Sequence, residues 1–203
     1  MNNHAFTLIE LLIVVLIIAI LAAIAVPNFL EFQTRAKASR AKADLRSLAT
    51  ALEAYAVDNN TYPPAKPAAA YFGLKPLSTP IAYITKAYLP DPFPDKSTTA
   101  LFPKLYFSYS GRTPDGKTAD RDNETVRAWL LISNGPDRTY GSIQGDLTAY
   151  LSAATQATRE RIAEDVLGRI YDPTNGTISD GDIFRTGGEY DAALTRFCPC
   201  FND

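Results

Sequence analysis

The stretch Ala5-Phe6-Thr7-Leu8-Ile9-Glu10-Leu11-Leu12 begins an apolar run that continues to Val26. From Leu11 to Val26 every residue is Leu, Ile, Val or Ala. Counted from Phe6, the run is about 21 residues long, and about 31 Å of helix at 1.5 Å per residue matches the hydrocarbon thickness of a bilayer. The sequence therefore predicts a membrane-spanning helix near its beginning.

A single charge, Glu10, interrupts the start of this apolar run. A carboxylate in lipid is costly and needs a partner or a function. Within a stack of helices, an ionised Glu10 can pair with the positive N-terminus of a neighbouring subunit, and such a pair would select the register of assembly. The alternative, an ordinary single-pass anchor, gives this carboxylate no comparable use.

A secretory signal peptide would have a basic first region and a cleavage site after its apolar core. Here the small residue Ala5 precedes the core, so we expect the apolar segment to remain on the mature protein. The sequence from Ala5 to Glu10 resembles the prepilin-peptidase site of type IV pilins and type II secretion pseudopilins, with Ala5 where Gly is usual. The resemblance implies that the leader, residues 1–5, is removed, that the new N-terminal Phe6 is methylated, and that Glu10 is retained.

The helix is expected to continue beyond the apolar run. Pro27 follows directly, and a proline inside a helix bends it or allows local melting; the resemblance implies a flexible point there during filament packing. Residues 28–57 contain no Gly or Pro, and their apolar side chains recur at three- and four-residue spacing. We therefore expect one helix of roughly 50 residues, with a membrane-embedded part (6–27) and an amphipathic part (28–58). The expected stripe is Ala38, Ala41, Leu45, Leu48, Leu52 and Tyr55.

Residues 59–203 suffice for one globular domain with its own core. Leu105–Ser110 and Val126–Ser133 are rich in aromatic and apolar residues between turn signals, which predicts two antiparallel strands packed on the long helix. A second short helix is expected near Ile81–Lys86. Residues 147–167 show helical spacing, and we interpret them as an insertion that is either a solvated helix or a subunit-specific surface. The predicted fold class is α+β, and it is similar to the type IV pilin fold.

Two further groups of residues are candidates for binding or cross-linking. The phrases that contain Asp137, Asp180 and Asp182 resemble the calcium loop of the major pseudopilins, and carboxylates with loop carbonyls suit calcium. Plain turn chemistry explains the same residues equally well. Cys198 and Cys200 could form a strained disulfide, stay as free thiols or bridge two chains.

The composition argues against an enzyme and against a nucleic-acid surface. The formal net charge is −2, and no block of Lys or Arg is present. The single histidine, His4, lies in the predicted leader, so the mature chain would lack the commonest general base and zinc ligand. No other catalytic constellation is evident.

The resemblance implies a structural subunit of a type IV pilus-like filament, most closely a type II secretion pseudopilus that drives protein export. A type IV pilus subunit for adhesion or motility is the near alternative, and a membrane-anchored extracellular binding module is the alternative of another class. The implied partners are further copies of the chain, prepilin peptidase, the inner-membrane assembly platform and the membrane itself. The implied location is the bacterial inner membrane, with the globular domain in the periplasm.

Overall fold

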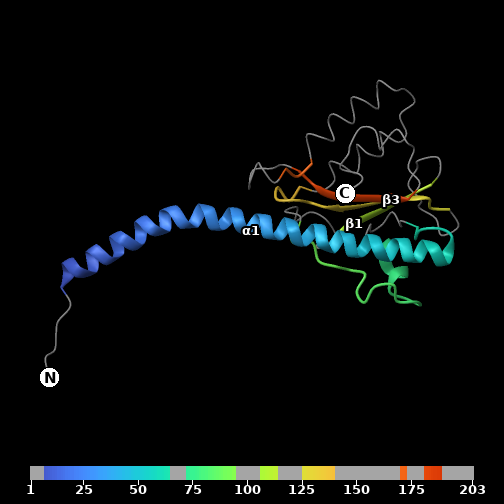
Figure 1. Cartoon of the computed structure of the whole chain (residues 1–203), viewed down its shortest axis with the longest axis horizontal. Coiled ribbons are helices and arrows are strands. Elements are labelled where there is room, and N and C mark those ends of the chain that lie inside the picture. The colour runs from blue at the N-terminus through green and yellow to red at the C-terminus, as the bar shows by residue number, and fades with distance from the viewer. Residues whose placement is uncertain are drawn as a thin grey trace, which may run out of the picture.

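The computed structural model describes residues 7–64, 72–94, 106–113, 125–139, 170–172 and 181–188. One helix, α1, runs from Leu8 to Asn59 as 52 continuous residues, about 78 Å at 1.5 Å per residue. It passes through Pro27 without a break, and Figure 1 shows that its apolar first part is curved. The predicted single long helix is confirmed.

The ends of α1 have clear local causes. At its start, the side chains of Thr7 and Glu10 satisfy each other's free backbone N–H groups in a capping box. At its end, Asn60 adopts a left-handed conformation with φ 56°, and its N–H donates to the Ala56 carbonyl at 2.8 Å. Asn tolerates this conformation better than most residues, which explains why the helix ends there.

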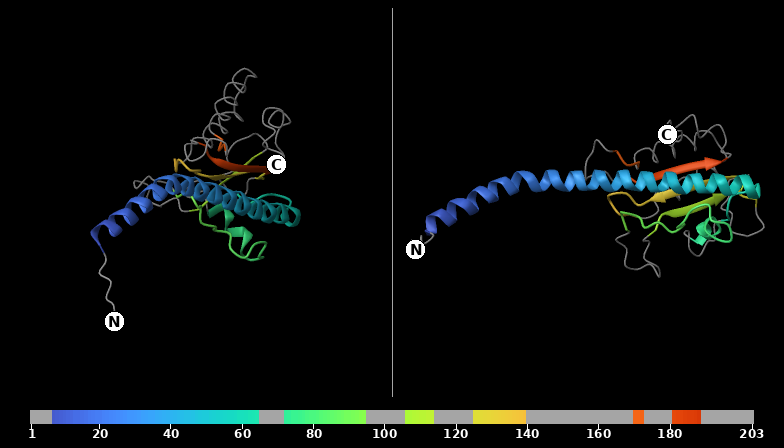
Figure 2. Two further views of the ribbon diagram at one scale, coloured as in Figure 1. Left: turned by 60° about the vertical axis from the view of Figure 1, so that its left-hand side comes forward. Right: turned by 60° about the horizontal axis from the view of Figure 1, so that its bottom comes forward.

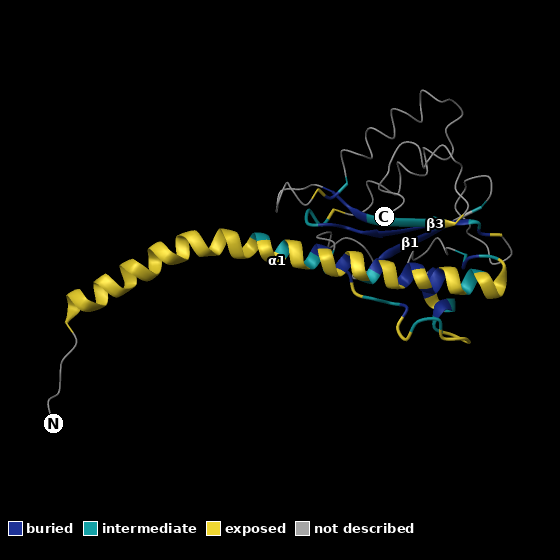
Figure 3. Cartoon of the chain, in the orientation of Figure 1, coloured by how far each residue is buried: buried dark blue, intermediate teal, exposed yellow. Residues whose placement is uncertain are grey.

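The two halves of α1 lie in different surroundings (Figure 3). No residue from Leu8 to Leu30 is buried, whereas the second half has a buried stripe that packs on the domain. The predicted stripe is confirmed at five positions, and Tyr55 is half-buried against the same core. The buried residues of α1 are Ala38, Ala41, Leu45, Leu48, Ala49, Ala51 and Leu52.

The described strands form one antiparallel sheet in the order β1-β2-β3, and this sheet covers the second half of α1 (Figure 2). The strands are β1 (Ser108–Arg112), β2 (Ala128–Ser133) and β3 (Ile183–Gly188). In the register, Leu130 of β2 lies opposite Ser110 of β1 and Thr186 of β3. The first two strands confirm the prediction with ends shifted by no more than three residues, while β3 was missed.

The central strand β2 is buried along its whole length. Its Trp129 is 1% exposed and packs with Tyr109, Phe107 and the α1 stripe in a single core. The opposing residue of β3 is Gly187, where a Cβ atom would lie 2.3 Å from the Trp129 ring. A glycine is therefore required at this point of β3, which makes the strand hard to find from residue preferences.

A short 3₁₀ helix, η1 (Phe72–Leu77), places Leu74 and Leu77 in the core. The predicted second helix near Ile81–Lys86 was wrong, because that stretch is irregular. The Leu77 carbonyl accepts from the N–H groups of both Tyr83 (2.9 Å) and Ile84 (3.2 Å). These two bonds span six and seven positions, and they close a wide turn in place of a helical one.

Candidate assembly site

The N-terminal half of α1 presents an exposed apolar surface. The large apolar side chains between Leu8 and Phe32 are 46% to 83% exposed, and none contacts the domain core. By length and composition, α1 is the one helix in the described ranges that could cross a membrane. Water is a poor environment for such a surface, so it must be covered by lipid or by protein.

Glu10 lies at the start of this surface and makes local contacts. Its carboxylate Oε2 accepts from the Thr7 N–H at 2.9 Å and from the Thr7 hydroxyl at 2.7 Å. The Thr7 Oγ1 in turn accepts from the Glu10 N–H at 3.3 Å. The carboxylate is exposed, so it caps its own helix while staying accessible to another chain.

The predicted cleavage residues, Ala5 and Phe6, lie outside the described residues. So do Asp180, the cysteines Cys198 and Cys200, and the insertion at 147–167. Pro27 lies within the exposed apolar half of α1, and its predicted role in filament packing stays a prediction.

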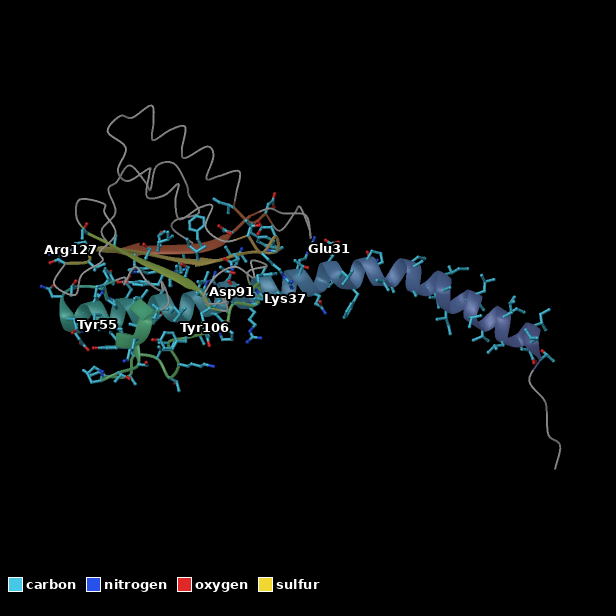
Figure 4. The ribbon with its side chains drawn as sticks, turned by 180° about the vertical axis from the view of Figure 1, so that it is seen from behind. Glu31, Lys37, Tyr55, Asp91, Tyr106 and Arg127 are labelled. Atoms are coloured by element: carbon cyan, nitrogen blue, oxygen red, sulfur yellow. The ribbon has the colours of Figure 1, made fainter. Side chains whose placement is uncertain are left out.

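Two ion pairs follow the apolar surface on α1. Arg35 pairs with Glu31 at 2.6 Å, and Arg40 approaches Asp44 at 3.7 Å. Both pairs have helical i, i+4 spacing, and only Asp44 among their four side chains is partly buried, so each pair adds little stability. Figure 4 shows Glu31 and Lys37 on this part of the helix, beyond the apolar half.

A buried carboxylate, Asp91, connects the turn before Phe93 to the end of β2. Its Oδ1 accepts from the Phe93 N–H and the Ser133 hydroxyl, each at 2.8 Å, and its Oδ2 accepts from the Asn134 N–H at 3.0 Å. Asp91 is 5% exposed, and burial raises its pKa, with the charge of Asp44 acting in the same direction and the three hydrogen bonds opposing them. The sequence analysis did not identify this role.

A second carboxylate, Glu53, connects α1 to the sheet. Its Oε2 accepts from the Tyr62 hydroxyl at 2.8 Å, and its Oε1 accepts from the Trp129 indole N–H at 3.1 Å. The rings of Tyr62 and Trp129 also pack edge to face, with centroids 6.5 Å apart. The sequence offered no signal for this bridge, because the helix pattern placed Glu53 on the solvent side.

Two of the three calcium candidates are described, and they lie on adjoining segments. Asp182 is buried beside the turn that carries Asp137. The contact is close, since a Cβ atom on Gly135 would lie 2.0 Å from the Gly181 carbonyl oxygen and 3.3 Å from the Asp182 Cα. Among the described residues, no group of three potential metal ligands is present.

A long helix with an exposed apolar first half, packed by its second half on a small antiparallel sheet, is consistent with the pilin fold. The described site therefore defines a pilin-like protein, whose exposed helix surface is its distinguishing feature. Comparisons with known proteins agree with this class. Residues 1–26 match the family model for the prokaryotic N-terminal methylation motif, and residues 28–100 match the model for protein G of the type II secretion system.

Curated relatives fall into two groups. The chain is 55% identical over 61 residues to the type IV major pilin PilA of Myxococcus xanthus, covering 30% of this chain and 28% of the relative. It is 40% identical over 79 residues to the type II secretion core protein G of Pseudomonas aeruginosa (39% and 56% of the two chains). It is 47% identical over 79 residues to the type IV wide pilus major component PilA4 of Thermus thermophilus (39% and 59%).

The alignments thus span between 28% and 59% of these relatives' own length. No solved structure gives a significant match to the chain. The family-model matches lie within residues 1–100, which contain the methylation motif, α1 and the segment that follows it, while the sheet is assigned from the fold.

Proposed function

We propose that this chain is a structural subunit of a type IV pilus-like filament and that it polymerises through the apolar half of α1. The observation that carries the proposal is the exposure of this surface, from Leu8 to Phe32, on a helix that extends beyond the domain. Burying a Leu, Ile or Val side chain contributes about 1.5–3 kcal/mol. Helices from several copies, packed together, would bury this surface when the subunit leaves the membrane.

Glu10 allows a sharp test of assembly. Gln also completes a capping box, so Glu10→Gln should keep the local cap on Thr7 while removing the charge. Thr7→Ala is the matched variant, since it removes the hydroxyl that accepts from the Glu10 N–H and keeps the charge. If Glu10 pairs with the N-terminus of a neighbouring chain, Glu10→Gln should abolish filaments in sheared-cell fractions, and Thr7→Ala should reduce them less.

The opposite ranking, with Glu10→Gln assembling normally, would reduce Glu10 to a helix cap and remove the electrostatic part of the proposal. Normal assembly and function of both variants would favour the membrane-anchored binding module. That alternative needs no contact between copies of the helix.

The proposal extends to processing and location. Prepilin peptidase would cut between Ala5 and Phe6, and the new N-terminal Phe6 would be methylated. Before assembly, α1 would cross the inner membrane with the domain in the periplasm, and the assembly platform there would extract it. The match over residues 1–26 supports processing, and the apolar helix supports membrane insertion.

Within this class we favour a type II secretion pseudopilus subunit, because the protein G family model matches residues 28–100. A surface pilus for adhesion or motility is the second candidate, favoured by the similarity to type IV pilins. Deleting the chain should leave secreted proteins in the periplasm in the first case. In the second case, secretion should stay normal and surface attachment or movement should be lost.

Calcium is the one cofactor that we propose. Asp182 and the turn around Asp137 adjoin each other, and they supply carboxylate and carbonyl oxygens, the ligand types that calcium prefers. Asp180 would complete the carboxylate set. The ion would act structurally, by holding the turn after β2 to the segment that leads into β3.

A further inference from the structure

The basic residues of α1 are concentrated in one short segment. No Lys or Arg precedes Arg35 in the chain, and none lies between Arg46 and the end of the helix. The basic segment, residues 31–46, contains five basic and two acidic residues, which leaves a formal charge of +3. Filament assembly through the apolar half of α1 gives this charge no role. The charged residues of the segment are Glu31, Arg35, Lys37, Arg40, Lys42, Asp44 and Arg46.

The basic segment begins where the exposed apolar surface ends, and Figure 4 shows Lys37 at this junction. From Leu8 to Phe32 the apolar run is about 36 Å long, so a tilted helix places Phe32 at the edge of the hydrocarbon. Arg35 and Lys37 follow Phe32 by about 4.5 Å and 7.5 Å along the helix, whereas Arg46 follows it by about 21 Å. The headgroup region extends about 5–8 Å beyond the hydrocarbon. In a membrane-embedded chain, the first two cations therefore lie at the level of the lipid phosphates.

The cations of the basic segment are accessible from the membrane side. Side chains on an α-helix point back toward its N-terminus, which in this segment is the direction of the membrane, and the long stems of Lys and Arg can extend further that way. The side chains of Arg35 and Arg40 are 47% and 67% exposed. The first buried residue of α1 is Ala38, so the domain does not enclose the helix at the headgroup level.

The acidic residues of the segment cancel little of this charge. Glu31 pairs with Arg35, but the pair is exposed at i, i+4 spacing, and such pairs are weak. Lys37 forms no ion pair within the described part of the chain. One cation at the headgroup level thus has no described counter-charge, and the cation beside it has only a weak one.

We propose that the basic segment binds the phosphate groups of anionic phospholipids while α1 spans the membrane. Arg and Lys donate charge-assisted hydrogen bonds to phosphate oxygens. Arg35 and Lys37 contact the headgroups directly, while Arg40 and Lys42 act over a distance comparable with the Debye length, about 8 Å. The contact holds α1 at one depth, with the domain outside the headgroup layer. This binding rests on the proposed membrane insertion of α1 and is independent of filament assembly.

A second copy of the chain is the other partner that could neutralise this charge. The acidic residues of α1 beyond the basic segment are Glu53 and Asp58. Both already accept hydrogen bonds from side chains of their own chain. These internal bonds, and the position of the basic segment directly after the apolar run, favour the lipid.

The test places the full chain in phosphatidylcholine vesicles that contain a trace of spin-labelled phosphatidylcholine or spin-labelled phosphatidylglycerol. Electron paramagnetic resonance separates the lipids that the protein slows from those of the free bilayer. We expect the association of phosphatidylglycerol to exceed that of phosphatidylcholine about threefold. High salt should remove the preference, because it screens the attraction between exposed charges.

Variants locate the preference on α1. Arg35→Gln with Lys37→Gln should lower it at least twofold. The matched control is Arg46→Gln with Lys75→Gln, which removes the same two kinds of charge farther from the membrane and should leave the preference unchanged. Lys75 is exposed on η1, which packs beside Pro64 after the end of α1.

Glu31→Gln gives a change in the opposite direction. It removes the counter-charge of Arg35, so the preference for phosphatidylglycerol should rise, and a misfolded variant would not produce such a gain. A preference that stays constant or falls in Glu31→Gln would overturn the proposal. Equal losses in the two double variants would overturn it as well.

Two outcomes separate this binding from the proposed function. If the chain slows both lipids equally, α1 is inserted and the headgroup contact alone is refuted. If it slows neither lipid, membrane insertion itself is refuted, and the headgroup contact with it. Equal slowing together with a loss of filaments in Arg35→Gln with Lys37→Gln would assign the charge to contacts between copies of the chain.

Discussion

Replacing Asp91 should destabilise the domain, and the loss should be larger when the new side chain has no oxygen to accept hydrogen bonds. Asp91→Ala leaves the N–H groups of Phe93 and Asn134 without their acceptor, whereas the Ser133 hydroxyl can rotate. A buried donor left unpaired costs about 1–3 kcal/mol. Since the substitution also removes a carboxylate whose burial is unfavourable, we expect a net loss of about 3 kcal/mol in the free energy of unfolding.

Asp91→Asn should cost less. With its carbonyl in the Oδ1 position, the amide still accepts from Phe93 and Ser133, but its NH₂ group faces the Asn134 N–H. One hydrogen bond is lost and two donors face each other, so the free energy of unfolding should fall by about 1–2 kcal/mol. Asp58→Asn is the matched control, because Asp58 is exposed, Asn keeps an oxygen that can accept from the Tyr83 hydroxyl, and surface changes of this kind cost about 0.5 kcal/mol or less.

The pH dependence gives an independent check. Because burial raises the pKa of Asp91, the folded chain binds a proton more tightly at this residue than the unfolded chain does. The part of stability that comes from proton binding at Asp91 is therefore fully present below its unfolded pKa of about 4 and is lost as the pH rises through its folded pKa. Relative to Asp91→Asn, the unsubstituted chain should gain stability on acidification through this window.

The assay is urea unfolding of the full chain in micelles, followed by tryptophan fluorescence. Trp129 is the only tryptophan in the chain, and it is 1% exposed between sheet and helix. A stability difference from Asp91→Asn that stays constant with pH, or that shrinks on acidification, would refute the reasoning about the buried charge. A loss below 1 kcal/mol in Asp91→Ala would refute the role of Asp91 as the acceptor for both backbone donors.

Three further changes follow from the same structure. Glu53→Ala should lower the free energy of unfolding by about 2 kcal/mol, because the Trp129 indole N–H loses its acceptor; an unchanged urea midpoint would show that this bond adds nothing. Gly187→Ala should cost more, about 3 kcal/mol, since its Cβ would lie 2.3 Å from the Trp129 ring; normal stability with native fluorescence would contradict the tight contact. Calcium should raise the melting temperature, and the paired substitutions Asp137→Asn and Asp182→Asn should remove that increase; if chelator has no effect on the unsubstituted chain, the calcium proposal fails.

The features predicted correctly from sequence depend on local patterns. The apolar run and the stripe from Ala38 to Leu52 can each be recognised within one element, so α1 was predicted nearly to its ends. The strands β1 and β2 were found for the same reason, because aromatic and apolar residues cluster there.

The features that were missed depend on contacts between distant segments. β3 ends in two glycines, and Gly187 is explained by the Trp129 ring on the neighbouring strand. The role of Asp91 comes from Ser133 and Asn134, more than forty positions along the chain. Residue preferences cannot report such pairs, because each partner alone has an ordinary role.

The most direct test of the central claim is the intact mass and N-terminal residue of the chain recovered from sheared filaments of its own cells. A filament-forming subunit predicts a chain that begins at methylated Phe6 and is enriched in the sheared fraction. A chain that still begins at Met1, and that stays in the membrane fraction of cells with active prepilin peptidase, would contradict the account.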